Sequence, residues 1–200
     1  GLPKDRLGER MAWVLSMAGL AGRQGALTGT LSGGWKQRLA LGCAILHEPP
    51  IVFLDEPTGG VDPISRRRFW ELIQRLAEEG TTVIVTTHFL DEAEYCNEIL
   101  LIDAGRLIAS GTPTELKTEH IRHPILEVRT GNVVAALETI RVQPWAIETS
   151  VFGTAVHVMV EEERRGEESV RATLAAAGVP VDGVERIVPS LEDVFLYLLE

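Results

Sequence analysis

The chain has 200 residues, of which 45% are hydrophobic and 24% are charged, so it can bury a core and is not expected to be disordered. Lys and Arg total 19 against 29 Asp and Glu, and the net charge of −10 argues against general binding to nucleic acid phosphates. Cys43 and Cys96 match no metal or redox spacing, which is typical of reduced thiols in the cytosol. No apolar run approaches the roughly 20 residues that a membrane-spanning helix needs.

The first predicted element is a helix at residues 7–20, whose apolar side chains recur at nearly helical spacing. The helical pattern is already under way close to Gly1, so we expect coding sequence upstream of the chain. A second helix is predicted from residue 32 to about residue 46, with Thr30 and Ser32 as candidate caps.

Two short apolar runs follow, at residues 51–57 and 81–88, and both are typical of strands buried in a parallel sheet. Residues 65–80 between them predict a helix, and the order strand, helix, strand implies right-handed parallel α/β packing. A short helix at 90–96 and a hairpin across 100–111 are then expected to close the first domain.

The pattern changes after a polar connection predicted at residues 112–124. The elements expected beyond it are strands at 125–130, 145–152, 155–161 and 184–189, and helices at 132–140, 167–178 and 190–200. This order is the split β-α-β arrangement, so it predicts a small α+β ferredoxin-like domain. The predicted division of the chain is a first domain at 1–118 and an accessory domain at 125–200. The last helix has one apolar face, which either closes the small core or pairs with a copy of itself.

The segment LSGG, at residues 31–34, stands directly before the second predicted helix. Ser32, Gly33 and Gly34 would present a hydroxyl and backbone N–H groups at the positive end of that helix, an arrangement that suits a phosphate group. A plain helix cap, with glycines that allow the turn, is the alternative interpretation of the same residues.

Two acidic residues, Asp55 and Glu56, end the first predicted strand. Two buried carboxylates without partners are costly, so a cation or a reacting group is expected beside them, and an exposed strand end is the alternative. His88 ends the next predicted strand, so we expect its ring at the carboxyl edge of the sheet, where ligands bind in such sheets. A purely structural role is the alternative for this histidine. The other four histidines match no motif and are predicted to be surface or packing residues: His47, His120, His123 and His157.

Four motifs in a fixed order carry a family resemblance: LSGG at 31–34, IVFLDEP at 51–57, GGVDP at 59–63, and VIVTTH ending at His88. They resemble the signature loop, Walker B strand, D-loop and switch histidine of ABC-type ATPases, and the resemblance covers roughly residues 1–118. The surrounding sequence is most similar to ATP-binding subunits of bacterial exporters of the ABC-2 or drug-exporter type. The fold class that this implies is α/β, the C-terminal part of an ABC ATPase domain with a parallel sheet and helices, followed by the small ferredoxin-like domain.

The resemblance also implies chemical roles for the residues at the strand ends. Asp55 would hold Mg²⁺ through water, and Glu56 would polarise the attacking water as a general base. His88 would contact the γ-phosphate and the catalytic water and stabilise the developing charge. The cofactors expected on this basis are ATP and Mg²⁺.

The remaining motifs are expected to act across a dimer interface. By resemblance, Ser32, Gly33 and Gly34 would contact the γ-phosphate held by the opposite subunit, and Asp62 would lie in the D-loop that connects the two sites. The partners implied are a second ATP-binding domain, as a homodimer or a fused tandem, and ABC-2 type membrane permease subunits, with no nucleic acid. The protein would then be cytoplasmic and peripheral on the inner face of the cell membrane. One departure from the family is Trp35, which stands where Gln is usual.

The sequence contains no G-x-x-x-x-G-K-[ST] phosphate loop, and no glutamine loop precedes the signature. We therefore expect a C-terminal fragment that neither binds ATP tightly nor hydrolyses it alone, whereas its parent is an ATPase coupled to transport. Two alternatives are ATPases outside transporters. One is a ribosome-associated ABC ATPase. The other is a DNA-repair or chromosome-type lobe, which the acidic charge and the lack of heptads in residues 1–30 disfavour.

Overall fold

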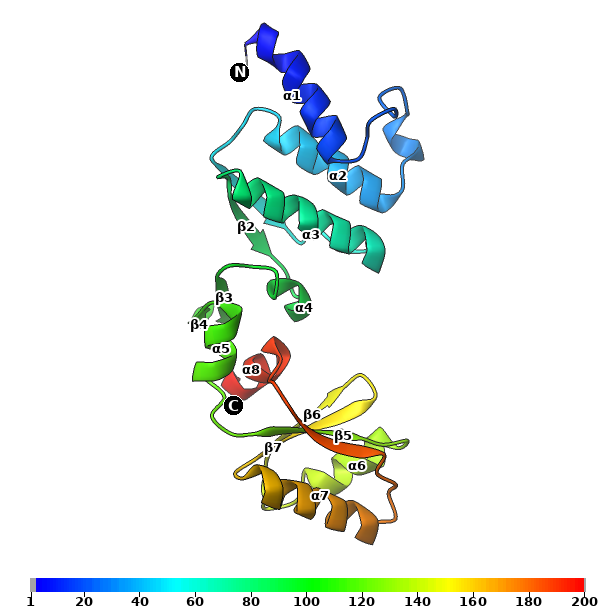
Figure 1. Ribbon diagram of the computed structural model, residues 1–200, viewed down its shortest axis with the longest axis vertical. Helices are drawn as coiled ribbons and strands as arrows, with labels where there is room; N and C mark the ends of the chain where they lie inside the picture. Colours follow the sequence, from blue (N-terminus) through cyan, green and yellow to red (C-terminus); the bar gives the residue numbers. More distant parts are fainter. Residues whose placement is uncertain (1–2, 200) are drawn as a thin grey trace. The chain divides into compact units, whose positions relative to one another are not determined.

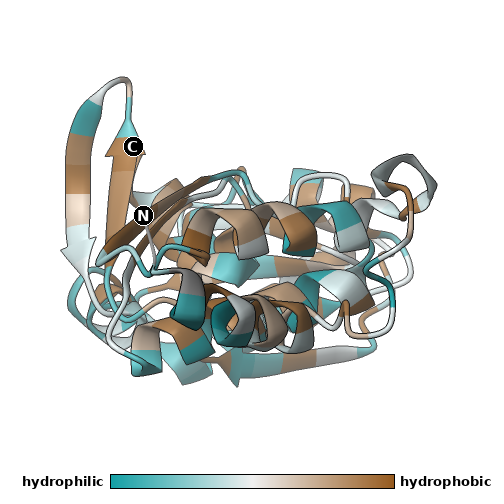
Figure 2. Cartoon of the chain, turned by 90° about the horizontal axis from the view of Figure 1, so that it is seen from above, coloured by the Kyte–Doolittle hydropathy of each residue, from teal (hydrophilic) through white to brown (hydrophobic). Residues whose placement is uncertain are grey.

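A computed structural model describes residues 3–199, and the chain divides into two compact units, Gly1–Phe89 and Leu90–Glu200. Each unit has its own helices, strands and core (Figure 1). The helices carry bands of hydrophobic and hydrophilic residues in turn, which is typical of helices with one face in a core (Figure 2). Within residues 3–199, none of the helices combines the length and the apolar character needed to cross a membrane.

The first unit contains the predicted strand–helix–strand sequence. Its elements are α1 (Lys4–Met17), the 3-10 turn η1 (Thr28–Thr30), α2 (Gly33–Ile45), β1 (Ile51–Asp55), α3 (Pro63–Glu78) and β2 (Thr82–Thr86). Strands β1 and β2 pair in parallel, with Ile51 opposite Thr82 and Asp55 opposite Thr86. The parallel register brings the carboxyl ends of both strands to the same edge.

One face of this two-stranded sheet is covered and the other is open. Helix α3 packs beside β2 and buries one apolar side: Phe69, Trp70, Leu72, Ile73 and Leu76. On the strands, Val52 is buried, whereas Phe53 is 73% exposed and Ile84 is 46% exposed. The prediction of strands buried on both faces is therefore wrong for this structure. Among the described residues the sheet has only two strands and one covering layer, so alternate apolar side chains face outward.

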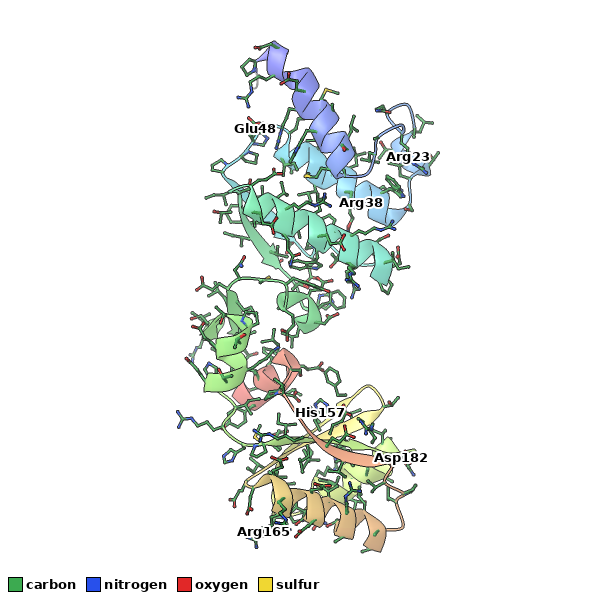
Figure 3. All side chains as sticks on the ribbon, in the orientation of Figure 1. Arg23, Arg38, Glu48, His157, Arg165 and Asp182 are labelled. Carbon is green, nitrogen blue, oxygen red and sulfur yellow. The ribbon has the colours of Figure 1, made fainter. Side chains whose placement is uncertain are left out.

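Helices α1 and α2 are joined at one end by polar contacts and further along by close packing. The Arg10 guanidinium donates to the carbonyl of Ile45 over 3.1 Å, which satisfies one of the carbonyls at the end of α2. Arg6 forms an ion pair of 3.0 Å with Glu48, the residue labelled beyond α2 in Figure 3. A Cβ at position 42 would lie 2.7 Å from Val14 Cγ1, so the glycine there allows the two helices to approach.

The second unit begins with helices and a hairpin that precede the ferredoxin-like sheet. Its first elements are α4 (Leu90–Ala93), β3 (Ile99–Asp103), β4 (Arg106–Gly111) and α5 (Pro113–Glu119). The predicted hairpin is confirmed: Ala104 and Gly105 both have positive φ, 45° and 76°, as a tight two-residue turn requires. The predicted polar connection at 112–124 is partly wrong, because α5 lies within it. Thr112 and Glu115 form a capping box there, which is a helix-start signal.

The later elements form a ferredoxin-like domain, as predicted. They are β5 (Ile125–Arg129), α6 (Val133–Ile140), β6 (Ala146–Phe152), β7 (Ala155–Val160), α7 (Glu163–Ala176), β8 (Gly183–Ile187) and α8 (Leu191–Leu198). The strand order is β6-β7-β5-β8 and each pair is antiparallel. Helices α6 and α7 cover one face of this sheet and α8 lies against the other (Figure 1).

Helix α8 closes a core within the second unit. Leu191 and Val194 are almost fully buried and pack with Ile125 and Met159 of the sheet, as the core-closing interpretation of this helix predicts. The same core includes apolar residues of the hairpin and α5: Ile99, Leu101, Ala109 and Leu116. The packing boundary thus lies at residue 89, and the functional division into 1–118 and 125–200 stays a prediction.

A buried polar pair fixes α8 to the sheet. His157 on β7, labelled in Figure 3, is 4% exposed. Its Nδ1 lies 2.8 Å from Oδ1 of Asp193 in the first turn of α8. Asp193 also accepts hydrogen bonds from the backbone N–H and hydroxyl of Ser190. Burial raises the pKa of the Asp193 carboxyl, but the hydrogen bonds from His157 and Ser190 outweigh burial and hold that pKa below its ordinary value. His157 is therefore a packing residue, which is one of the two roles, surface or packing, predicted for it.

This pair predicts a pH-dependent contribution to stability. The folded-state pKa of Asp193 lies below its unfolded value, so the stabilisation is complete above about pH 4 and is lost as the pH falls through the folded-state pKa. We expect Asp193→Asn to lower the free energy of unfolding by about 3 kcal/mol at pH 7, because it removes a buried carboxylate that bonds to the His157 ring and accepts from Ser190. Urea unfolding of the wild type and of Asp193→Asn at pH 7 and pH 3 measures the difference in their free energies of unfolding, and this difference should be smaller at pH 3. Glu168→Gln, at an exposed side chain, is the control, and an equal difference at both pH values would contradict the assignment.

Candidate nucleotide-contacting site

The carboxyl edge of β1 and β2 brings a carboxylate and an imidazole together. Glu56 directly follows β1, His88 lies two residues after β2, and His88 Nδ1 is 2.5 Å from Glu56 Oε2. The Glu56 side chain is 43% exposed and the His88 side chain is 65% exposed, so a ligand outside the sheet can reach both. Glu56 has φ of 46°, in the left-handed region that is uncommon for residues other than glycine. Such local strain is found where the chain must aim a side chain in a defined direction.

Asp55 lies at the same edge and is held by the neighbouring strand. Its Oδ1 accepts a hydrogen bond from the hydroxyl of Thr86, the residue opposite it in the register. The carbonyl of Thr86 accepts a bond of 3.0 Å from the N–H of Glu56. Thr86 therefore orients both acidic residues. It lies within the motif VIVTTH but was given no role there, because only the strand register reveals the pairing.

The acidic pair is exposed, which changes the argument for its function. Asp55 and Glu56 are both exposed, so the cost of burying unpaired carboxylates, on which the sequence argument relied, does not apply here. The support comes instead from geometry, since three polar side chains meet at one sheet edge beyond parallel strands, where ligands of such sheets bind.

The oxygen groups at Asp55 fit one side of a magnesium site. Mg²⁺ prefers oxygen ligands and in nucleotide sites is held by one or two carboxylates together with phosphates and water. Residues 3–199 contain no group of three or more His, Cys, Asp or Glu side chains placed to hold a metal ion by themselves. The Asp55 carboxylate, with the Thr86 hydroxyl beside it, therefore suits a metal ion whose other ligands are phosphate oxygens and water.

The glycine turn leaves its helix N-terminus without a side-chain cap. Helix α2 begins at Gly33 with Ser32 at the N-cap position, yet the Ser32 side chain makes no capping hydrogen bond. The carbonyl of Ser32 accepts from the N–H groups of Trp35 and Lys36. Ser32 and Gly33 are exposed, and Gly33 has open space where a side chain would be. This geometry disfavours the plain-cap alternative and leaves a positive helix end facing outward.

Trp35 forms a platform for two guanidinium groups at the start of α2. Arg23, from the preceding loop, lies 4.7 Å from its ring centroid and Arg38 lies 4.4 Å from it. Figure 3 marks Arg38 on α2 and Arg23 on the segment before it. Arg38 is buried and its Nε donates to the carbonyl of Gly34 over 3.2 Å. Burial lowers the pKa of Arg38, Arg68 lowers it further, and the charge of Asp62 opposes both.

Asp62 acts as a helix cap in this structure. Its carboxylate accepts from the backbone N–H of Ser65 over 3.0 Å at the start of α3. The hydrogen bonds from Ser65 hold the pKa of Asp62 below its ordinary value, so the cap stays ionised at neutral pH. Ser65 belongs to no motif in the sequence, although it stands at the helix position that commonly pairs with a capping aspartate.

The predicted site residues thus form two groups within the first unit. Asp55, Glu56 and His88 meet at the sheet edge. Gly34 and the capping residue Asp62 lie around Ser65, with Ser32 and Gly33 at the exposed end of α2. In the described part of the chain, no hydrogen bond or ion pair joins Glu56 or His88 to the glycine turn.

Comparisons with known proteins point to the same family as the motifs. The ABC transporter family model matches residues 4–59. The protein named "Probable multidrug ABC transporter ATP-binding protein YbhF" from Escherichia coli strain K12 is 51% identical over 119 residues, which are 60% of this chain and 21% of that protein. Nod factor export ATP-binding protein I from Rhizobium sp. strain N33 is 36% identical over 200 residues, covering 99% of this chain and 63% of that protein.

A solved structure gives the same result for the fold. The structure of cbiO1 from Clostridium perfringens, part of the ABC transporter complex cbiONQ, has 33% sequence identity and a TM-score of 0.55, covering 60% of this chain and 48% of that one. The chain therefore spans less than two thirds of the length of each of these relatives. The family model, the shared sequence and the α/β fold thus agree with the motifs in identifying part of an ABC transporter ATP-binding domain in this chain.

Proposed function

We propose that this chain is part of the ATP-hydrolysing subunit of an ABC exporter, with 1–118 as the end of its nucleotide-binding domain and 125–200 as an accessory domain. The observation that carries the proposal is the contact between Glu56 and His88 beside Asp55, at the carboxyl edge of parallel strands. The names of the relatives, for multidrug transport and Nod factor export, support the exporter class.

The geometry at this edge suits the attack of water on a terminal phosphate. The Glu56 carboxylate accepts a proton from the attacking water, whose oxygen bonds to the γ-phosphorus while the bond to the ADP oxygen breaks. His88 contacts the Glu56 carboxylate and is placed to donate to the phosphate oxygens, on which charge develops. Asp55 would hold Mg²⁺ through water, and a magnesium ion held there would supply positive charge beside the phosphate oxygens.

The glycine turn is proposed to serve a different nucleotide from the one beside Glu56. Ser32 and the N–H groups of Gly33 and Gly34, at the uncapped end of α2, would meet a γ-phosphate held by a second ATP-binding domain. That domain is a second copy or a fused tandem partner, and ABC-2 type permease subunits would place the assembly at the inner face of the cell membrane. The absence of any bond between the glycine turn and the Glu56–His88 pair, within residues 3–199, is compatible with two separate nucleotides.

The first prediction from this proposal concerns ATP binding by the chain itself. The sequence has no phosphate loop, so Glu56, Asp55 and His88 have nothing to hold the triphosphate against them. We expect isothermal titration calorimetry with Mg-ATP to show no micromolar binding to the 200-residue chain. The positive control is a chimera in which a segment carrying a G-x-x-x-x-G-K-[ST] phosphate loop, taken from the ATP-binding domain of an ABC transporter, is joined upstream of this chain. Micromolar binding by the chain alone would contradict the proposal.

The second prediction concerns the roles of Glu56 and His88 in that chimera. Glu56→Gln keeps the shape of the side chain but removes the proton acceptor, so we expect kcat for ATP to fall about 10²-fold or more while ATP binding persists. His88→Ala should lower kcat by a similar factor, because it removes both the orienting contact and a phosphate donor. His47→Ala, at a histidine outside the motifs, is the control. Steady-state phosphate release measures the rates, and unchanged kcat in Glu56→Gln would rule out the general-base role.

A further inference from the structure

The two glycines of the turn have different surroundings. A Cβ at Gly33 would meet no atom within 4 Å. A Cβ at Gly34 would lie 2.8 Å from Cβ and 2.9 Å from Oγ of Ser65, closer than real Cβ contacts come. Gly34 is also buried, whereas Gly33 is exposed. The first turn of α3 therefore requires glycine at position 34, independently of any ligand.

Ser65 is itself held at a fixed place on α3. Its backbone N–H donates to Oδ1 of Asp62 over 3.0 Å, and its hydroxyl also bonds that carboxylate. Because Asp62 caps α3, these bonds fix Ser65 relative to the helix axis. The side chain that a Cβ at Gly34 would meet is therefore held in place by the cap of α3.

The other side of Gly34 is held by Arg38. The buried Arg38 side chain donates from Nε to the Gly34 carbonyl over 3.2 Å. The charge of Asp62 favours the ionised guanidinium and so offsets part of the effect of burial on its pKa. Gly34 thus lies between Arg38 on its own helix and Ser65 on the next one.

The loop that follows Glu56 also places a side chain beside Gly34. The N–H of Gly59 donates to the Glu56 carbonyl, and the N–H of Val61 donates to the Thr58 carbonyl, both over 3.1 Å. Val61 is buried, and its Cγ1 would lie 3.5 Å from a Cβ at Gly34. A run of hydrogen-bonded turns therefore connects the carboxylate at the sheet edge to the packing around Gly34.

We propose that Ser65 is a positioning residue for the glycine turn. By setting how closely the first turns of α2 and α3 approach, it fixes where Ser32 and Gly33 stand relative to the Glu56 loop of the same chain. This inference rests on the proposed function, in which Glu56 serves one nucleotide and the glycine turn serves another. A displacement of the loop at 57–61 beside the first nucleotide then moves the turn that contacts the second.

The contact is tested by compensating substitutions in the 200-residue chain, without nucleotide. Gly34→Ala should lower the thermal midpoint by about 4 °C or more, because the added Cβ overlaps Ser65. In the Gly34→Ala background, a second substitution Ser65→Gly should recover most of the lost thermal midpoint. The substitution Ser65→Ala, which keeps the Cβ, should not recover it. Gly33→Ala is the control in open space and should leave the midpoint nearly unchanged.

Positioning is tested by amide hydrogen exchange and by turnover. In Ser65→Gly we expect exchange at the N–H groups of Trp35 and Lys36 to quicken about tenfold, because the α2 turn loses its support. Arg67→Gly, on the exposed side of α3, controls for the effect of glycine on the helix. In the chimera, Ser65→Gly should lower kcat about tenfold with KM for ATP unchanged, since misplacement of the turn affects alignment more than binding.

The outcomes separate this inference from the proposed function. Equal exchange in Ser65→Gly and Arg67→Gly, or failure of Ser65→Gly to rescue Gly34→Ala, would overturn the role of Ser65. Quicker exchange and rescue together with unchanged kcat would show a purely structural contact and also overturn it. A wild-type chimera without ATP turnover would count against the proposed function, and the exchange data would still decide whether Ser65 positions the turn.

Discussion

The parallel pairing of β1 with β2 is the constraint on which the candidate site depends. Because both strands run in the same direction and Asp55 stands opposite Thr86, the residues that follow them leave the sheet at one edge. Glu56 and His88 come from positions 32 residues apart in the sequence (88 minus 56) and meet there at 2.5 Å. An antiparallel pair, or a register shifted by one residue, would place these side chains at different edges or on different faces. The strand pairing therefore determines the chemistry at the edge more directly than burial does.

The glycine turn shows that one motif meets two physical requirements. Gly33 faces open space, where a side chain would obstruct an approaching phosphate. At Gly34, in contrast, Ser65 leaves no room for a side chain. The same packing, through Val61 and Asp62, leads back to the loop that follows Glu56. Trp35, the departure from the usual glutamine, places its ring beside two guanidinium groups, those of Arg23 and Arg38.

Much of the fold was predictable from the sequence, because local patterns carry it. Apolar runs separated by a helical pattern predicted the parallel pair, and Asp103-Ala104-Gly105 predicted the hairpin turn. The order of strands and helices after residue 124 predicted the ferredoxin-like sheet, whose order β6-β7-β5-β8 agrees. Helix α5 was missed because a proline-bearing polar segment resembles a loop, although its capping box at Thr112 and Glu115 is a helix signal. The exposed face of β1 and β2 was missed because an apolar run shows that a strand is suited to burial and does not show how many neighbours cover it.

The candidate site was predictable in its residues and less so in its geometry. Motif order selected Asp55, Glu56 and His88, and the structure brings them to one edge, while their roles in hydrolysis stay proposals. Thr86 and Ser65 act through contacts between elements, which spacing along the chain does not reveal. Arg38 acts within α2, through the Gly34 carbonyl and the Trp35 ring.

The account is tested most directly by a structure of the chimera with a non-hydrolysable ATP analogue and Mg²⁺. The account predicts that two copies enclose two nucleotides, with Glu56 and His88 of one copy beside the γ-phosphate that faces Gly33 of the other. Nucleotide bound away from the edge of β1 and β2, or Ser32 and Gly33 facing solvent in the nucleotide-bound state, would contradict it.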